Sequence, residues 1–199
     1  RVTISGGADL WAKEQVAIEW EQSERISLHD VAEQAGVSID TVLRHRAGKR
    51  VRSAAAVAEA LVAYDSVENQ SLTQAHNKRV TIEVPASVDE ELGAFLGYLV
   101  GDGHISRVKR HLGLTSGDLE QANRFAEIGQ ELFGVTPVIK KDEGRWRVLL
   151  HSEELSDLLT EELGLTDGPS AAEKQTPLAI LKSPKPVVAS FLRALFDCD

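Results

Sequence analysis

The chain has 199 residues and a formal net charge of −9 at pH 7, with 42% hydrophobic and 27% charged residues. This length has room for one full domain plus a small one, and the composition is that of an ordinary globular protein. No stretch is long and apolar enough to span a membrane, and the single cysteine excludes an internal disulfide framework. We expect a cytoplasmic protein without a membrane partner. The chain lacks Met and stops at Asp199, so we also expect it to be a piece of a longer protein.

The acidic net charge argues against uniform affinity for nucleic acid, but the basic residues are unevenly placed. In the first half of the chain, several basic residues follow one another with no intervening acid, at Arg44, Arg46, Lys49, Arg50 and Arg52. Local clusters of this kind matter more for a DNA-binding surface than the total charge does.

Two short helices joined by a glycine turn are predicted just before this basic cluster. Val31 and Ala32 indicate the first helix, Gly36 supplies a left-handed turn residue, and Ser38 can cap a second helix that runs to Arg44. This arrangement matches the helix-turn-helix plan of DNA-binding proteins. The alternative is a plain helical hairpin with a basic, solvated loop.

The segment Leu28–Ala47, with Asp-Val-Ala-Glu-Gln-Ala-Gly-Val-Ser-x-x-Thr-Val, resembles the DNA-reading segment of lactose-repressor-type regulators. The resemblance implies that the second helix enters the major groove and that the basic residues after it lie near phosphates. The residues implicated in DNA binding are Ser38, Ile39, Asp40, Thr41, Arg44, His45, Arg46, Lys49, Arg50 and Arg52.

We expect residues 1–65 to form this helical DNA-binding module. Apolar residues predict a supporting helix over Asp9–Gln22, and an Ala-rich helix completes the module at Ser53–Tyr64. Residues 66–86 are predicted to be a linker, polar at first and ending in a short strand over Arg79–Val84.

The remaining residues, 87–199, alternate between helical and strand patterns. Ser87-Val88-Asp89-Glu90 is a capping box that opens an apolar helix. The patterns after it predict strands over His104–Val108 and His111–Thr115, a helix from Asp118 to Gly134, strands over Val135–Lys140 and Arg145–Leu150, and an acidic helix from Ser152 to about Gly164. The order helix, two strands, helix, two strands, helix predicts an α+β fold, in which a four-stranded antiparallel sheet carries helices on one face.

The other face of this sheet should be open and basic. The residues expected on it or in its turns are Arg107, Lys109, Arg110, Lys140, Lys141, Arg145 and Arg147. A curved basic sheet is suited to lying along double-stranded DNA.

The apolar helix over Phe95–Gly103 has features that an ordinary core helix does not require. Gly97 and Gly101 lie one turn apart on one face, so another backbone can approach that face closely. Asp102 follows at the C-terminal end, where the helix dipole disfavours an anion and a carboxylate usually needs a partner such as a cation.

A second stretch, Leu192–Asp199, repeats this pattern. Ala194 and Cys198 are small residues one turn apart, and Asp199 repeats the terminal acid. Two helices with small faces and paired acids predict a closely packed pair that shares one metal site.

The two helices, whose acids are 97 residues apart (199 − 102), resemble the paired motifs of the LAGLIDADG homing endonucleases. The block Glu173–Pro184 resembles the lysine-containing block that precedes the second motif in intein-borne members, so the resemblance covers Ser87–Asp199. It implies that Asp102 and Asp199 bind a divalent metal, which we take to be Mg²⁺. It also implies that Lys174 stabilises charge or polarises the attacking water, whereas the alternative is a solvated surface lysine.

The sequence therefore predicts a fragment of an intein-encoded, site-specific DNA endonuclease that makes metal-dependent double-strand breaks by phosphodiester hydrolysis. The expected partners are double-stranded DNA and, for an intein, the flanking exteins of the host protein. The full-length protein is expected to be a monomeric pseudo-dimer and the isolated fragment to be inactive.

Two alternatives stay open. One is a non-catalytic, sequence-specific DNA-binding regulator on a LAGLIDADG scaffold, as in sporulation regulators that pair this fold with a helix-turn-helix. In those regulators the helix-turn-helix follows the scaffold and the metal acids are lost, whereas here it comes first and Asp102 and Asp199 remain. The other is a splicing element whose nuclease is decaying.

Overall fold

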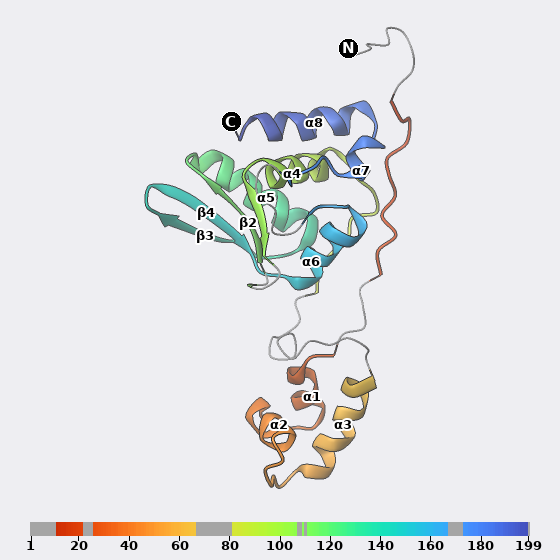
Figure 1. The fold of residues 1–199 in the computed structure, drawn as a ribbon, viewed down its shortest axis with the longest axis vertical. Helices are drawn as coiled ribbons and strands as arrows, with labels where there is room; N and C mark the ends of the chain where they lie inside the picture. Colours follow the sequence, from red (N-terminus) through yellow and green to blue (C-terminus); the bar gives the residue numbers. More distant parts are fainter. Residues whose placement is uncertain are drawn as a thin grey trace. The chain divides into compact units, whose positions relative to one another are not determined.

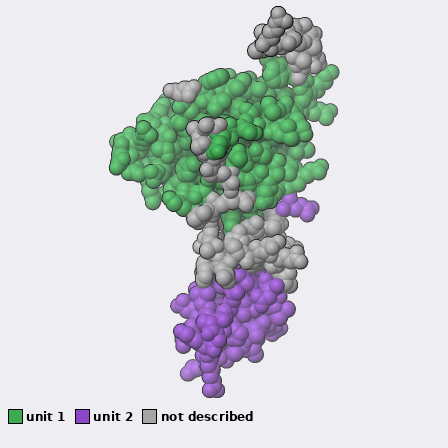
Figure 2. Space-filling view, in the orientation of Figure 1, with its two compact units in different colours: residues 1–20, 80–199 green, residues 21–79 purple. Residues whose placement is uncertain are grey.

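The computed structural model describes residues 11–21, 26–66, 81–106, 109, 111–166 and 173–198. The chain divides into two compact units, residues 1–20 with 80–199 and residues 21–79 (Figure 2). Each unit has its own hydrophobic core. In the described part of the chain, no helix combines the length and the apolar character needed to cross a bilayer.

The smaller unit is built from three helices, α1 (Leu28–Gln34), α2 (Ile39–Arg46) and α3 (Ala54–Ser66) (Figure 1). Their apolar side chains meet in one cluster that includes Leu28 and Val42, neither of which is exposed to solvent. Burial of this shared cluster is what holds such short helices in place, because isolated helices of this length are marginal in water.

Local signals in the sequence determine where these helices begin. Ser27 and Asp30 form a capping box: the Ser27 hydroxyl accepts a hydrogen bond from the Asp30 N–H (3.1 Å), and the Asp30 carboxylate accepts one from the Ser27 N–H (2.7 Å). Gly36 turns the chain between α1 and α2 at a φ of +63°, where a residue with a Cβ is strained. Ser38 is the N-cap residue of α2, and its hydroxyl lies 3.1 Å from the Thr41 hydroxyl.

The helix predicted over Asp9–Gln22 is wrong over its described part. Residues 11–21 contain no helix, and Ala17 forms an antiparallel bridge with Ser87 of the larger unit. Every second side chain packs against the larger core, which is the period of a strand and not of a helix. The described part of residues 1–20 thus belongs to the larger unit, although we expected it within the helical module; the inward side chains are Val16, Ile18 and Trp20.

The larger unit contains a four-stranded antiparallel sheet in the order β1-β2-β4-β3. The predicted α+β fold with such a sheet is confirmed. The strands are β1 (Gly103–Ser106), β2 (His111–Ser116), β3 (Val138–Asp142) and β4 (Arg145–Leu150).

Helices α4 and α5 pack on one face of this sheet, and α8 lies alongside α4 (Figure 1). The sheet's pairing places Leu112 opposite Leu150 and Leu114 opposite Val148, all four on the covered face. The helices of this unit are α4 (Glu90–Gly101), α5 (Leu119–Phe133), α6 (Glu153–Asp157), a π-helix (Leu158–Glu162), α7 (Leu178–Leu181) and α8 (Lys185–Phe196).

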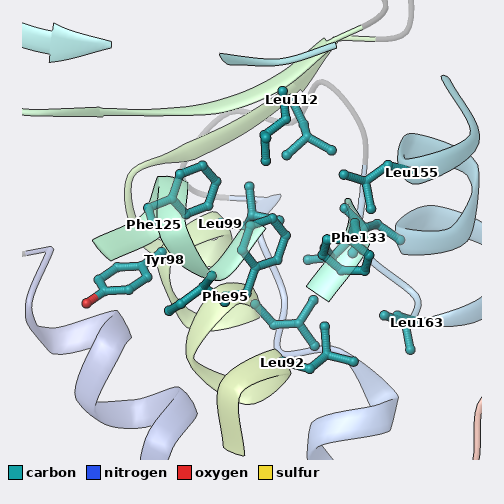
Figure 3. Packing of buried hydrophobic residues seen from close by; sticks show 14 of the residues in the cluster. Leu92, Phe95, Tyr98, Leu99, Leu112, Phe125, Phe133, Leu155 and Leu163 are labelled. Carbon is teal, nitrogen blue, oxygen red and sulfur yellow. The ribbon is translucent and has the colours of Figure 1, made fainter. Parts of the chain in front are cut away.

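Aromatic residues of α4 and α5 form the centre of the core (Figure 3). The ring of Phe95 stacks on that of Phe125 with centroids 4.8 Å apart, and Phe133 meets Phe95 at 5.3 Å. Such pairs stabilise the core beyond the burial of their surface. They hold α4 firmly against the sheet, which leaves its opposite face for α8.

The face of α4 that meets α8 is made of glycines. A Cβ built on Gly97 would lie 2.9 Å from the Ala194 Cβ and would overlap the Phe191 carbonyl oxygen. A Cβ on Gly93 would lie 2.9 Å from the Val187 carbonyl oxygen, and one on Gly101 only 2.5 Å from the Cys198 sulfur. The two helix backbones therefore approach as closely as they do because these positions carry no side chain.

We predict that Gly97→Ala destabilises the larger unit by about 1–3 kcal/mol, since the added methyl group must push α8 away. This loss should exceed the gain in helix propensity on replacing a helical glycine. Urea denaturation followed by tryptophan fluorescence measures the change, because Trp11, Trp20 and Trp146 all belong to this unit.

Gly117→Ala is the matched control, because a Cβ there meets nothing within 4 Å. We expect its urea midpoint to stay at or slightly above that of the wild type. Equal midpoints for the two variants would show that the glycine face is not needed for packing.

Candidate functional site

Asp102 stands at the junction between α4 and β1. It is the C-cap residue of α4, and its N–H donates a hydrogen bond to the Tyr98 carbonyl (3.1 Å) while its side chain is exposed. Gly103 begins β1 immediately afterwards, and a Cβ there would lie 2.7 Å from the Leu99 carbonyl oxygen. The turn is thus too tight for any residue larger than glycine at position 103.

Lys174 contacts the backbone around this junction. Its ammonium donates hydrogen bonds to the carbonyl oxygens of Leu99 (3.3 Å), Gly101 (2.8 Å) and Gly103 (2.7 Å). Burial lowers the pKa of Lys174, and the nearby Asp102 carboxylate opposes that shift. The alternative of a solvated surface lysine is therefore wrong.

The C-terminal end of α8 lies beside this junction. Cys198 packs against Gly101 and donates a hydrogen bond from its thiol to the Ala194 carbonyl (3.3 Å). Burial raises the pKa of the Cys198 thiol, although the Asp102 N–H acts in the opposite direction. A raised thiol pKa disfavours the reactive thiolate, so the contacts of Cys198 agree with a role in packing. Asp199, the second expected metal ligand, lies outside the described residues.

Gln121 of α5 holds the same end of α8, a role for which the sequence carries no local signal. Its side-chain amide donates hydrogen bonds to the Asp197 carbonyl (2.7 Å) and to the Cys198 sulfur (3.6 Å). The residue is nearly buried. A glutamine in an amphipathic helix is usually assigned to the solvated face, so only the three-dimensional contact shows its partner.

The donor chemistry at the junction suits a hard divalent cation. Asp102 offers an exposed carboxylate, and carboxylate oxygens are preferred ligands of Mg²⁺ and Ca²⁺. Within the described ranges, no group of three or more His, Cys, Asp or Glu side chains is placed to bind a metal.

The open face of the sheet carries part of the predicted basic surface. Pairing places Lys140 opposite Arg147 and Asp142 opposite Arg145, and all four belong to the face away from Val148. Arg147 also forms an ion pair with Asp142 (3.1 Å), with both side chains about half exposed. We call Lys140, Arg145 and Arg147 the basic sheet face.

Lys141 does not belong to this face, contrary to our expectation. It pairs with Trp146 on the opposite side of the sheet, and its ammonium lies 5.1 Å from the centre of the Trp146 ring. Successive residues of a strand point to opposite faces, so adjacent lysines cannot share one. Lys109 is exposed in the turn between β1 and β2, whereas Arg107 and Arg110 lie outside the described residues.

Three histidines form a row next to the basic sheet face. The His104 and His111 rings are 5.4 Å apart, and those of His111 and His151 are 5.5 Å apart. Burial is the main cause that lowers the pKa of His104 and of His111, and their cationic neighbours, including Arg147, act in the same direction. The lowered pKa values favour the neutral form of the His104 and His111 imidazoles.

In the smaller unit, most residues expected to contact DNA are exposed. Ile39 is partly buried, because it packs against the core of that unit. The Arg46 guanidinium lies 5.1 Å from the Tyr64 ring centre, so this contact stabilises α2 against α3 as well. Thr41 and His45 are partly exposed; the exposed residues are Ser38, Asp40, Arg44, Arg46, Lys49, Arg50 and Arg52.

Part of the larger unit is similar to a known protein family. Residues 89–164 match the family model of the LAGLIDADG-like domain. This range begins at the N-cap of α4 and ends just after the π-helix, so it contains the whole sheet.

Several curated proteins are similar to this chain over rather more than half its length. The replication factor C small subunit of Methanocaldococcus jannaschii is 35% identical over 114 residues, 56% of this chain and 6% of that protein. An A-type ATP synthase subunit of Pyrococcus abyssi is 31% identical over 118 residues, 59% of this chain and 11% of that protein. The isomerizing glutamine–fructose-6-phosphate aminotransferase of M. jannaschii is 28% identical over 119 residues, again 59% and 11%. The chain thus spans only a small part of each relative.

The lowered pKa of His111 predicts a pH dependence of stability. The unfolded chain, with a histidine pKa of about 6.5, binds a proton more readily than the folded protein does. This contribution is therefore present above pH ~6.5 and is lost as the pH falls through the folded-state value.

The contribution of His111 is measured by comparing the urea midpoints of the wild type and His111→Asn at pH 8 and at pH 5. We expect the wild type to lose more stability than the variant between these two values. An equal or larger loss in the variant would contradict the assignment.

Proposed function

We propose that this chain is a segment of an intein-borne LAGLIDADG homing endonuclease, which cuts both strands of a DNA site by metal-dependent phosphodiester hydrolysis. One observation carries the proposal. Within a LAGLIDADG-like domain, a glycine-faced helix ends in the exposed carboxylate of Asp102, directly beside the end of the helix that packs against it.

The names of the relatives support the insertion of this segment into a host protein. Each match covers more than half of this chain, so the matched stretches overlap, yet the three proteins are named for three unrelated activities. Each match also accounts for about a tenth of its protein or less. A segment shared by such different proteins is best explained as a mobile insertion, which is what an intein is.

The charges on the sheet support binding to double-stranded DNA. Lys140, Arg145 and Arg147 share the face that the helices leave uncovered, and each phosphate contact by such residues releases bound counterions. The exposed basic residues around α2 of the smaller unit offer a second surface, which acts as a helix-turn-helix in this proposal.

Asp102 and Asp199 would hold the divalent metal, with Mg²⁺ as the expected ion. When bound, the ion activates water and stabilises the leaving oxygen of the phosphodiester. The chain's own residues bind and orient the substrate: the basic sheet face contacts the DNA backbone, and the turn at Gly101–Gly103 fixes where the Asp102 carboxylate lies.

The exposed apolar side chains of α8 support a full-length protein that is a pseudo-dimer. The 97-residue offset between the motifs relates Leu192 to Phe95 and Phe196 to Leu99. Phe95 and Leu99 are 0% and 4% exposed beneath the sheet, whereas Leu192 and Phe196 are 40% and 66% exposed. We therefore propose that a second α/β half covers α8 as the described half covers α4, which gives one polypeptide with two halves.

A cleavage assay tests the nuclease. A chain containing both halves is incubated with Mg²⁺ and a plasmid that carries the host gene without the insertion. Wild type should linearise the plasmid, and Asp102→Asn should cut on the order of 100-fold more slowly, because it loses several kcal/mol of metal-derived stabilisation. Its affinity for the DNA in a gel-shift assay should stay within about twofold, since one exposed ligand is not a phosphate contact.

Glu127→Gln removes an exposed acid elsewhere in the same unit and should cut like the wild type. If the wild type binds the site but neither it nor the variants cut, the nuclease assignment fails. The DNA-binding regulator then becomes the better explanation.

Arg44→Gln tests the smaller unit. Arg44 is exposed on α2, and loss of a base or phosphate contact there should weaken binding to the cognate site by roughly tenfold. Lys182→Gln makes the same charge change at an exposed position outside both proposed surfaces and should bind within about twofold of the wild type. Equal affinities for the two variants would remove α2 from the DNA interface.

A further inference from the structure

The hydrogen bonds of Lys174 leave its ammonium no free donor. A lysine ammonium has three N–H groups and no acceptor. Here these groups meet three backbone carbonyls, those of Leu99, Gly101 and Gly103, at 2.7–3.3 Å. While these bonds are made, the side chain has no N–H left for a phosphate oxygen or a water molecule.

The three carbonyls lie where α4 ends and β1 begins, and carbonyls at a helix end need a donor from outside the helix. The last carbonyls of a helix have no partner within the helix and carry the negative end of its dipole. Leu99 and Gly101 are in the last turn of α4, and Gly103 is the first residue of β1. The ammonium of Lys174 therefore links the end of α4 to the start of β1 through hydrogen bonds, and it brings one positive charge to the helix end.

Asp102 lies between Gly101 and Gly103, whose carbonyls both accept hydrogen bonds from Lys174. A glycine backbone has more conformational freedom than any other, so glycines on both sides would leave an aspartate loosely placed. Packing requires both glycines, since a Cβ on Gly101 would meet Cys198 and one on Gly103 would meet Leu99. The hydrogen bonds from Lys174 to the carbonyls of Gly101 and Gly103 restrict the backbone motion that glycine would otherwise allow at these two positions.

We infer that Lys174 is a positioning residue, which holds Gly101–Gly103 in place so that the Asp102 carboxylate is presented to a divalent cation in one fixed position. It acts through the backbone of the ligand-bearing turn and does not touch the reacting phosphate. Only one part of this inference rests on the proposed function, namely that Asp102 binds a divalent cation. We call the hydrogen bonds from Lys174 to the carbonyls around Asp102 the clamp, and its effect on the turn can be measured without DNA.

Hydrogen–deuterium exchange tests the clamp. Lys174→Met keeps the length and the apolar stem of the side chain but removes all three donors. We expect exchange in a peptide covering residues 99–106 to accelerate by roughly tenfold or more, because charge-assisted hydrogen bonds are lost there. Peptides from α5 and β4 should exchange as in the wild type, which shows that the unit remains folded.

Two controls define the expected pattern. Lys182→Met removes an exposed lysine of the same segment and should leave every peptide unchanged. Asp102→Asn should leave the exchange of residues 99–106 close to that of the wild type, since it removes the ligand but keeps the clamp. Lys174→Arg keeps the charge, but a planar guanidinium cannot aim three donors at converging carbonyls, so it should fall between wild type and Lys174→Met.

Binding of Mn²⁺, followed by electron paramagnetic resonance, tests the consequence for the metal. Lys174→Met should weaken binding about tenfold or more, as loss of a group that orients a metal ligand does. Asp102→Asn should weaken it at least as much, and Lys182→Met should not change it. A residue that only stabilised the fold would lower the urea midpoint without changing Mn²⁺ affinity under conditions where the chain is fully folded.

The outcomes separate this inference from the proposed function. Unchanged exchange of residues 99–106 in Lys174→Met, or unchanged Mn²⁺ affinity despite faster exchange, overturns the positioning role. If Asp102→Asn binds Mn²⁺ like the wild type, the metal assignment of Asp102 fails, while the exchange data still decide whether Lys174 clamps the turn.

Discussion

The close packing of α4 against α8 determines where the C-terminal ends of these two helices lie. Gly97 and Gly101 leave the contact face of α4 without side chains, so the backbone of α8 fills the space that Cβ atoms would occupy. Core aromatic residues such as Phe95 fix the other side of α4. With α4 held on both sides, its C-terminal end and that of α8 lie side by side. The proposed metal site requires this arrangement, because two carboxylates can share one ion only when they lie close together.

Each helix end receives a donor from another element. The ammonium of Lys174 binds carbonyls at the end of α4, and the amide of Gln121 binds the Asp197 carbonyl at the end of α8. The two donors differ in charge, and this matters next to carboxylates. Lys174 places a positive charge at the negative end of the α4 dipole, whereas Gln121 adds no charge. The ends of the two helices thus differ in their electrostatics.

The sequence predicted what depends on local period and failed where distant residues meet. Alternating apolar residues located the four strands, and small residues one turn apart indicated the helix pair. The same alternation holds at Val16, Ile18 and Trp20, where the apolar residues also fit a helical pattern, and at Lys141, which lies on the opposite face from its neighbour Lys140. The contact of Lys174 with Gly101 joins residues 73 positions apart and has no local pattern.

The acidic net charge of −9 is compatible with DNA binding because of how the charges are distributed. The basic sheet face lies opposite the helices, and exposed acids such as Glu90, Glu91 and Glu127 lie on those helices. Fields from exposed charges fade within about 10 Å at ordinary salt, so DNA along the open face senses mainly the basic residues. The acids on the helices repel DNA that approaches from the wrong side. In the proposed complex, the overall negative charge would therefore limit non-specific binding and favour one orientation of the DNA.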